Sequence, residues 1–259
     1  MRPLSELPRE RARALVGVVF DLDDTALDHG LLTAAALAAL WRARRAGLRL
    51  VAATGRPAGW AEVFARALPI DGAIAENGAL AYFREGARVH ALEPRDGAGR
   101  AALVPLADEL CATFGARLAD DNGLRRTDVT IDVGENDRLP PETVTAMTRW
   151  AAARGLRATV SSVHVHLSSS PEDKASGVLR FLHRRFGEDP GSALARYAFV
   201  GDSGNDAACF AAFRVSVGVA NVAPHLARLS VPPRYVASAE RGAGFAETLD
   251  ALLALRAAP

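Results

Sequence analysis

Short apolar runs that alternate with helical segments place the strongest constraint on how this chain can fold. In the first eighty residues the apolar runs cover 15–22, 48–53 and 72–75, and helical segments between them cover 31–46 and 57–68. Continuous apolar runs of this length are typical of strands that are buried on both faces of a parallel sheet. Because strand and helix alternate, we predict a right-handed, doubly wound α/β sheet.

The same alternation returns near the C-terminal end. There we expect strands over 196–200, 214–219 and 235–237, and helices over 205–212 and 244–257.

The middle of the chain has a different pattern. Residues 127–133 (TDVTIDV) alternate between polar and apolar side chains, as a half-exposed antiparallel strand does. Around them we expect a hairpin over 80–89, helices over 99–114 and 141–154, and strands over 157–160 and 163–168. We therefore predict an α/β fold in two parts: a doubly wound, Rossmann-like core of residues 1–84 and 170–259, and an inserted α+β domain over residues 85–169.

Composition excludes several classes of protein. The 259 residues carry a net charge of +1, so no overall charge favours nucleic acid or a membrane surface. No apolar run approaches the roughly 20 residues that span a bilayer. The first 13 residues are polar and rich in arginine, and should form a loose or weakly helical extension rather than a signal peptide. The two cysteines lack metal-ligand spacing. We expect a cytoplasmic monomer or homodimer.

Polar residues gather where the predicted strands of the core end, and in open α/β sheets this edge binds the ligand. An acidic segment follows the first strand, a Thr-Gly-Arg segment follows the second, and a Gly-Asp-Ser-Gly-Asn-Asp segment follows a late strand. A lysine starts the helix after the inserted domain. These residues are Asp21–Thr25, Thr54–Arg56, Gly201–Asp206 and Lys174, which is the only lysine in the chain.

Four of these side chains, Asp21, Asp23, Asp202 and Asp206, would crowd carboxylates at one edge of the sheet. Carboxylates this close repel one another unless a cation neutralises them, and an all-oxygen site suits Mg²⁺. With the metal present, an aspartate can attack phosphorus and form an aspartyl phosphate. A second aspartate two residues later could protonate the leaving oxygen and then deprotonate water.

The transferred phosphoryl group mainly needs positioning and charge stabilisation, which Lys174, the hydroxyl of Thr54 and N–H groups at helix starts could supply. Each cluster alone has a plainer interpretation, because Asp-x-Asp can cap a helix and Thr-Gly-Arg-Pro can form a turn. All four clusters together, in this order and at strand ends, favour a catalytic site. The single lysine adds to this, because an ammonium is a compact point charge whereas a guanidinium is a broad fork.

The four segments resemble the motifs of the haloacid dehalogenase superfamily of phosphotransferases, over nearly the whole chain. Asp21–Thr25 is similar to its first motif, Thr54–Arg56 to its second, Lys174 to its third and Gly201–Asp206 to its fourth. The insertion before Lys174 resembles the cap of subclass IIB. That subclass includes Cof-like sugar-phosphate phosphatases, sucrose-phosphate phosphatase, mannosyl-3-phosphoglycerate phosphatase and phosphomannomutase.

The resemblance implies a role for each catalytic residue. Asp21 would be the nucleophile and Asp23 the general acid/base, and Thr54 and Lys174 would bind the transferring phosphoryl group.

It also implies how the metal is held. Mg²⁺ would be bound by Asp21, the backbone carbonyl of Asp23 and Asp202, with Asp206 acting through the water shell of the metal. The residues of the core that would bind substrate or support its pocket are Gly55, Arg56, Asn77 and Asn205.

The inserted domain, the cap, would close over this site, exclude water and set specificity. Its candidate residues are Arg125, Arg126, Asp132, Ser161, Ser162, His164 and His166. The two histidines share one strand face, which could line a polar cleft or face solvent. The arginine pair could grip a second anionic group, such as a carboxylate, or could simply be exposed.

We therefore expect a Mg²⁺-dependent phosphatase that hydrolyses a small phosphate monoester through an aspartyl phosphate. The expected substrate is a sugar phosphate or a phosphorylated disaccharide or glycoside. One alternative is a phosphomutase, which returns the phosphoryl group to a sugar. Another is a non-catalytic sensor of a phosphorylated ligand, against which the presence of both Asp21 and Asp23 argues.

Overall fold

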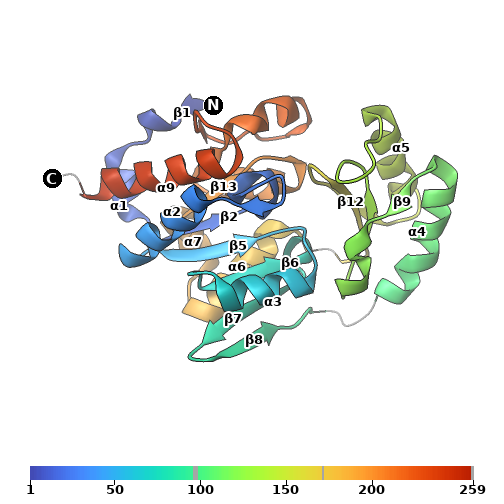
Figure 1. The fold of residues 1–259 in the computed structure, drawn as a ribbon, viewed down its shortest axis with the longest axis horizontal. Helices are drawn as coiled ribbons and strands as arrows, with labels where there is room; N and C mark the ends of the chain where they lie inside the picture. The colour runs from blue at the N-terminus through green and yellow to red at the C-terminus, as the bar shows by residue number, and fades with distance from the viewer. Residues whose placement is uncertain (96–98, 171, 258–259) are drawn as a thin grey trace.

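A nine-stranded sheet forms the centre of the larger part of the molecule (Figure 1). The computed structural model describes residues 1–95, 99–170 and 172–257. Across the sheet, the first seven strands pair in parallel, and the last two, β7 and β8, form an antiparallel hairpin at one edge. Their order is β1 (Arg2–Pro3), β15 (Tyr235–Val236), β14 (Val215–Gly218), β13 (Tyr197–Gly201), β2 (Gly17–Phe20), β5 (Arg49–Ala53), β6 (Gly72–Ala75), β7 (Leu80–Glu85) and β8 (Arg88–Leu92). The predicted doubly wound α/β core is confirmed.

Helices cover both faces of this sheet because its central strands are apolar on both sides. In β2, Val18 and Phe20 lie in one buried cluster, and Val19 lies in the other. The first cluster includes residues of α1 (Arg9–Ala14), α2 (Ala34–Arg45), α3 (Ala58–Ala67) and α9 (Arg241–Ala257). The second includes residues of α6 (Lys174–Phe186), α7 (Pro190–Arg196) and α8 (Ala207–Ala212).

Helix caps fix where two of these helices begin. The Thr33 hydroxyl accepts a hydrogen bond from the Ala36 N–H (3.2 Å) and so caps the start of α2. Asp173 and Ser176 form a reciprocal capping box at the start of α6. This capping box places Lys174 in the first turn of α6, beside the sheet.

The N-terminal segment is more ordered than the sequence indicated. Arg2 and Pro3 pair with β15 at the edge of the sheet, and α1 follows. Of the two alternatives predicted for this segment, the loose extension is wrong and the helical one is confirmed in part by α1. The reason is that Leu4, Leu7 and Ala12 are buried in the first apolar cluster, and this burial offsets the entropy lost when the segment is ordered.

The cap is a four-stranded antiparallel sheet with two helices on one face (Figure 1). Its strands, in order across the sheet, are β11 (Arg157–Val160), β12 (His164–Ser168), β10 (Val129–Asp132) and β9 (Arg117–Leu118). Helices α4 (Arg100–Phe114) and α5 (Pro141–Ala152) bury the apolar face, which includes Ile131 and Val165. The opposite, polar face of β10 and β12 is turned toward the core.

The boundary between core and cap differs from the predicted one. Residues 85–169 were expected to form the cap, but β8 pairs along its whole length with β7 in the large sheet. The hairpin over 80–92 thus belongs to the core, and the chain enters the cap only between Leu92 and Arg100. The cross-strand pairing of an exposed hairpin decides this, and it cannot be told from the alternation of side chains alone.

Candidate active site

Three neighbouring parallel strands bring the predicted acidic and hydroxyl residues to one edge of the sheet. Asp21 follows β2, Thr54 follows β5 and Asp202 follows β13, and these strands lie side by side in the order β13-β2-β5. All three side chains are buried. The structure therefore brings together clusters that are far apart in the sequence, as expected for strand ends of a parallel sheet.

Lys174 links two of the carboxylates. Its Nζ donates hydrogen bonds to Asp21 Oδ1 (2.7 Å) and to Asp206 Oδ1 (2.6 Å), and the lysine side chain is fully buried. The other oxygen of Asp206 accepts from the backbone N–H groups of Asp202 (2.9 Å) and Ser203 (3.2 Å). Asp206 thus holds both the lysine and the loop that carries Asp202.

Asp202 is fixed by two further side chains. Its Oδ1 accepts from the Thr25 hydroxyl (3.3 Å), and its Oδ2 accepts from Asn221 Nδ2 (3.2 Å). Thr25 therefore supports the site rather than acting in it. Asn221 also donates to the backbone carbonyl of Asp24 (2.9 Å), so it joins two loops of the site.

The three buried aspartates could hold a metal ion. One oxygen atom from each of Asp21, Asp202 and Asp206 lies within 4.8 Å of the others. Burial raises the pKa of Asp21 to about 8, with Lys174 opposing and Asp206 and Asp23 adding to the shift. Burial also raises the pKa of Asp202 well above its usual range. Clustered carboxylates with raised pKa values need a cation to ionise together, and the all-oxygen set suits Mg²⁺.

Burial alone would lower the pKa of Lys174, but Asp206 and Asp21 raise it above its ordinary value. The lysine is therefore a fixed positive charge beside Asp21. It can orient that carboxylate and attract an anionic phosphate group.

The Thr-Gly-Arg segment makes a tight turn against the cap. The Thr54 hydroxyl accepts from the Arg56 backbone N–H (3.0 Å). A Cβ atom at Gly55 would lie 2.8 Å from His166 Cε1 and 3.3 Å from Asn77 Oδ1, which is too close. Glycine at this position lets the His166 ring of the cap lie directly against the backbone.

Asn77 and Asn205 contact each other across the site. Asn205 Nδ2 donates to Asn77 Oδ1 (3.1 Å), and Asn77 has a positive φ of 53°. Asn77 Nδ2 is buried without a hydrogen-bond partner among the described residues. A buried donor of this kind suits a ligand oxygen.

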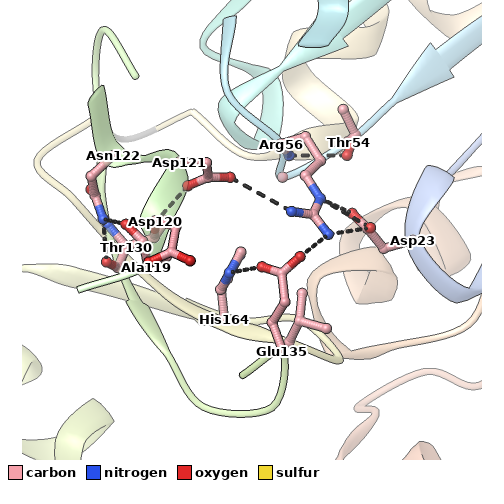
Figure 2. Close-up of polar contacts among 12 residues, drawn as sticks. Asp23, Thr54, Arg56, Ala119, Asp120, Asp121, Asn122, Thr130, Glu135 and His164 are labelled. Carbon is pink, nitrogen blue, oxygen red and sulfur yellow. Dashed lines mark hydrogen bonds and ion pairs between the residues drawn. The ribbon is translucent and has the colours of Figure 1, made fainter. Parts of the chain in front are cut away.

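Asp23 does not join the carboxylate cluster. Arg56 donates to it through Nε (2.9 Å to Oδ2) and Nη2 (2.8 Å to Oδ1), as Figure 2 shows. The same guanidinium reaches the cap, where Nη2 donates to Glu135 Oε1 (2.8 Å) and Nη1 lies 3.7 Å from Asp121 Oδ2. In this arrangement Arg56 holds a catalytic candidate and two cap residues, rather than a substrate.

The two cap histidines are buried, which excludes a solvent-facing sheet surface. His164 Nε2 lies 2.8 Å from Glu135 Oε2 (Figure 2). This contact, together with Arg56, lowers the pKa of Glu135 to about 2. His166 Nδ1 lies 3.2 Å from Asp128 Oδ2, and burial lowers the pKa of His166 to about 4. His166 is therefore neutral at pH 7.

The arginine pair of the cap is not placed to grip a substrate anion. Arg125 is buried and donates to Asp121, to Asp128 and to the backbone carbonyl of Gly55 (2.9 Å). The Arg125 guanidinium is thus buried and bonded to acceptors of the protein, so both alternatives are wrong for Arg125, which fastens the cap to the core. Arg126 is exposed, as the second alternative expected, and pairs with Glu93.

Glu76 is a residue of the site region to which the sequence reasoning assigned no role. Its carboxylate accepts from the backbone N–H groups of Arg126 (2.9 Å), Thr127 (2.6 Å) and Ala58 (3.1 Å), and also from the Thr127 hydroxyl. Burial and then Asp128 raise its pKa. Its position directly before Asn77, at a strand end, was the available signal. The sequence reasoning also assigned no role to Asp121, Asp128 or Glu135. For Asp121 and Asp128 the available signal was their helical spacing from Arg125, with which both form ion pairs.

Little space remains between cap and core at Asp21. The cavity there measures about 10 Å³, which is close to what one water molecule needs. It is lined by Asp21, Asp23, Gly55, Ser161, Ser162, His164, His166, Ser203 and Asn205. A larger groove of about 520 Å³ adjoins it and is bordered by Asp23, Arg56, Glu135, Ser162 and Asp202, among others.

Sequence comparisons point to the same chemistry. The family model for haloacid dehalogenase-like hydrolases matches residues 18–93, which include the first two clusters. The phosphoglycolate phosphatase of Metallosphaera sedula is 30% identical over 239 residues, which are 90% of this chain and 96% of that protein. The phosphoglycolate phosphatase of Pyrobaculum neutrophilum is 33% identical over 241 residues, which are 91% of this chain and 95% of that protein.

Solved structures share the fold. The crystal structure of Thermoplasma acidophilum 0175 has a TM-score of 0.73 and 18% identity, and covers 92% of this chain and 99% of that chain. A sugar phosphatase of subclass IIB has a TM-score of 0.61 and 17% identity, with 85% of this chain and 92% of that chain covered. Fold, site and relatives together define a phosphatase with a capped α/β core. The chain belongs to the haloacid dehalogenase-like hydrolases, and its fold is that of subclass IIB, as predicted.

Proposed function

We propose that this phosphatase hydrolyses a small phosphate monoester with Mg²⁺, through an aspartyl phosphate on Asp21. The observation that carries the proposal is the buried cluster of Asp21, Asp202 and Asp206 with Lys174 bonded to two of its members. A buried set of three carboxylates and one ammonium has an excess of negative charge, which fits a divalent cation.

The residues present fit Mg²⁺, which would be held by Asp21, Asp202 and the backbone carbonyl of Asp23. Asp206 would act through water bound to the metal. When bound, the metal neutralises charge on the phosphate oxygens and lets the carboxylates ionise together.

Each side chain then has a definite task. Asp21 attacks phosphorus while Lys174 and the Thr54 hydroxyl hold the phosphoryl oxygens. Asp23 gives a proton to the oxygen of the leaving alcohol, and this P–O bond breaks as the bond to Asp21 forms. Asp23 then takes a proton from water, which attacks the aspartyl phosphate and releases inorganic phosphate.

A phosphate ester does not fit in 10 Å³. We infer that substrate enters with the cap further from the core, and that the cap then closes and excludes water. His164, His166, Ser161 and Ser162, which line the small cavity, would then contact the substrate.

The first candidate substrate is 2-phosphoglycolate. Two relatives that are 30% and 33% identical, each aligned over at least 90% of this chain, carry that activity in their names. The structural neighbours named as sugar phosphatases are 17% identical, which supports a common fold and not a common substrate. A sugar phosphate, as the sequence suggested, remains the second candidate. A mutase would show isomerised sugar phosphate instead of free phosphate.

The test is release of inorganic phosphate from a panel that contains 2-phosphoglycolate, hexose phosphates, sucrose 6-phosphate and p-nitrophenyl phosphate, with and without Mg²⁺. We expect Mg²⁺-dependent turnover, and a loss of at least about 10³-fold in Asp21→Asn, as for removal of a nucleophile in other hydrolases. Asp250→Asn, which changes an exposed ion pair with Arg42, serves as the matched control. Undiminished turnover in Asp21→Asn would exclude Asp21 as nucleophile.

We further propose that the protein acts in the cytoplasm as a monomer or homodimer, without nucleic acid or membrane. The net charge of +1 gives no general attraction to nucleic acid or to a membrane surface. Within the described residues, no helix combines the length and the hydropathy needed to cross a membrane. Light scattering would give the oligomeric state.

A further inference from the structure

Arg56 connects the candidate acid/base of the core with the cap. Its Nη2 atom donates at once to Asp23 Oδ1 and to Glu135 Oε1, both at 2.8 Å (Figure 2). Asp23 belongs to the core and Glu135 to the cap. The two N–H donors of one nitrogen atom thus bond a carboxylate of the core and a carboxylate of the cap.

The core holds the base of Arg56 firmly. Its backbone N–H is bonded to Thr54, its side chain is 5% exposed, and its guanidinium lies 4.5 Å from the ring centroid of Trp60. These contacts leave the guanidinium little freedom except to turn in its own plane, toward Asp23 or toward the cap.

The cap holds Glu135 through its backbone and through one contact of its carboxylate. Both oxygens of Asp132 accept backbone N–H groups of the following loop, including Glu135 (2.8 Å) and Asn136 (2.9 Å). The far oxygen of Glu135 lies 2.8 Å from His164 Nε2 on β12. Glu135, in the loop that follows β10, is therefore tied to the cap sheet and moves with it.

When the cap moves away from the core, Glu135 and Asp121 leave and Arg56 keeps only Asp23. When the cap closes, Glu135 accepts a hydrogen bond from Nη2 and fixes the orientation of the planar guanidinium group. The orientation of the Asp23 carboxylate, which is bonded to Nε and Nη2, follows from the orientation of that group.

We propose that Arg56 and Glu135 are positioning residues that make the placement of the Asp23 carboxylate depend on closure of the cap. The inference rests on the proposed function, in which Asp23 protonates the leaving oxygen. It explains why a buried arginine stands beside the acid/base rather than at the substrate phosphate.

The experiment compares kcat/KM for two substrates, because kcat/KM reports the steps through departure of the leaving group. p-Nitrophenyl phosphate has a leaving group that departs as an anion and needs no proton. 2-Phosphoglycolate, or the best alkyl phosphate of the panel, has a leaving alcohol that does need one. A residue that places Asp23 affects the second substrate selectively, whereas a residue that only stabilises the fold affects both equally.

We expect Glu135→Gln and Arg56→Lys to lower kcat/KM for the alkyl phosphate at least about 10-fold more than for p-nitrophenyl phosphate, within the range of general acid catalysis. Lysine keeps the charge of Arg56 but cannot bond two carboxylates in a planar fork. Because Glu135 is partly exposed, its variant should fold even if the arginine variant does not. Glu109→Gln, which alters a surface ion pair of the cap with Arg154, should affect neither substrate.

Asp23→Asn separates the two ways in which this reasoning could fail. Asp23→Asn could lower kcat/KM selectively for the alkyl phosphate while Glu135→Gln lowers it equally for both substrates. That result would overturn the positioning role alone. No selectivity in Asp23→Asn would overturn the acid/base assignment and the positioning role with it. In the Asp23→Asn background, Glu135→Gln should add no further selectivity, and an additive effect would contradict a route through Asp23.

Discussion

Replacing Lys174 by methionine would remove the cation that bridges two buried carboxylates. The Nζ atom lies 2.7 Å from Asp21 and 2.6 Å from Asp206, and no part of the side chain is exposed. Removing one partner of a buried ion pair costs about 3–5 kcal/mol, because an uncompensated charge stays behind. We therefore expect metal-free Lys174→Met to lose about 3–5 kcal/mol of unfolding free energy at pH 8.

The loss should shrink as the pH falls. Burial raises the pKa of Asp21 to about 8 even with Lys174 in place, and without the lysine the pKa rises further. In the unfolded chain the same carboxyl ionises near pH 4. The folded variant thus binds more protons than the unfolded one above pH 4, so its stability falls as the pH rises toward the folded pKa. The parent shares this dependence up to its own folded pKa of about 8, so the difference in stability between variant and parent grows mainly above pH 8, by up to about 1.4 kcal/mol per pH unit for one proton.

Urea denaturation in EDTA, followed by tryptophan fluorescence at pH 8 and pH 9.5, measures both effects. Arg42→Met removes an exposed ion pair with Asp250 and should cost at most about 1 kcal/mol at either pH. A Lys174→Met variant that is as stable as the parent at pH 8 would refute the reasoning. So would an equal loss of stability at both pH values, since the buried carboxylates would then not be taking up the proton.

Three further outcomes follow from the contacts between cap and core. Burial lowers the pKa of His166 to about 4, so below about pH 6.5 the unfolded chain binds a proton that the folded chain does not. Stability should fall by up to about 1.4 kcal/mol per pH unit between pH 6.5 and 4, and denaturation curves of His166→Gln should show a smaller slope. Glu76→Ala leaves the N–H groups of Arg126 and Thr127 without their acceptor and should cost about 2–4 kcal/mol. Unchanged hydrogen exchange at these two amides would contradict that. Gly55→Ala places a Cβ 2.8 Å from His166 and should lower kcat/KM at least about 10-fold by obstructing close approach of the cap. Steady-state assays that give the parent's kcat/KM for Gly55→Ala would contradict this.

The positions of the catalytic candidates could be predicted because a parallel sheet has a simple geometry. Asp21, Thr54 and Asp202 each follow a strand, and the carboxyl ends of parallel strands meet at one edge. Lys174 could be predicted to join them because it begins a helix that packs on the same sheet. Local sequence patterns therefore predict the position of a side chain where the geometry of the sheet allows only one place for it.

The partners of the arginines could not be predicted in the same way. Arg125 and Arg126 form an exposed-looking basic pair in the sequence, yet Arg125 is buried between Asp121 and Asp128. Arg56 lies in a core motif, yet it contacts Glu135 from a loop 79 residues away. Ion pairs of this kind depend on how two separately folded parts come together, and no local periodicity records that.

The α/β class, the edge of the sheet that carries the chemistry and the charged residues around Asp21 could all be predicted from the sequence. These follow from apolar periodicity and from strand ends, which are properties of neighbouring residues. The tertiary structure alone decided that β8 belongs to the core, that His164 and His166 face the site, and that Arg56 joins Asp23 to the cap. Those outcomes depend on the docking of cap on core, where burial of charge forces each arginine and carboxylate to find a partner across the interface.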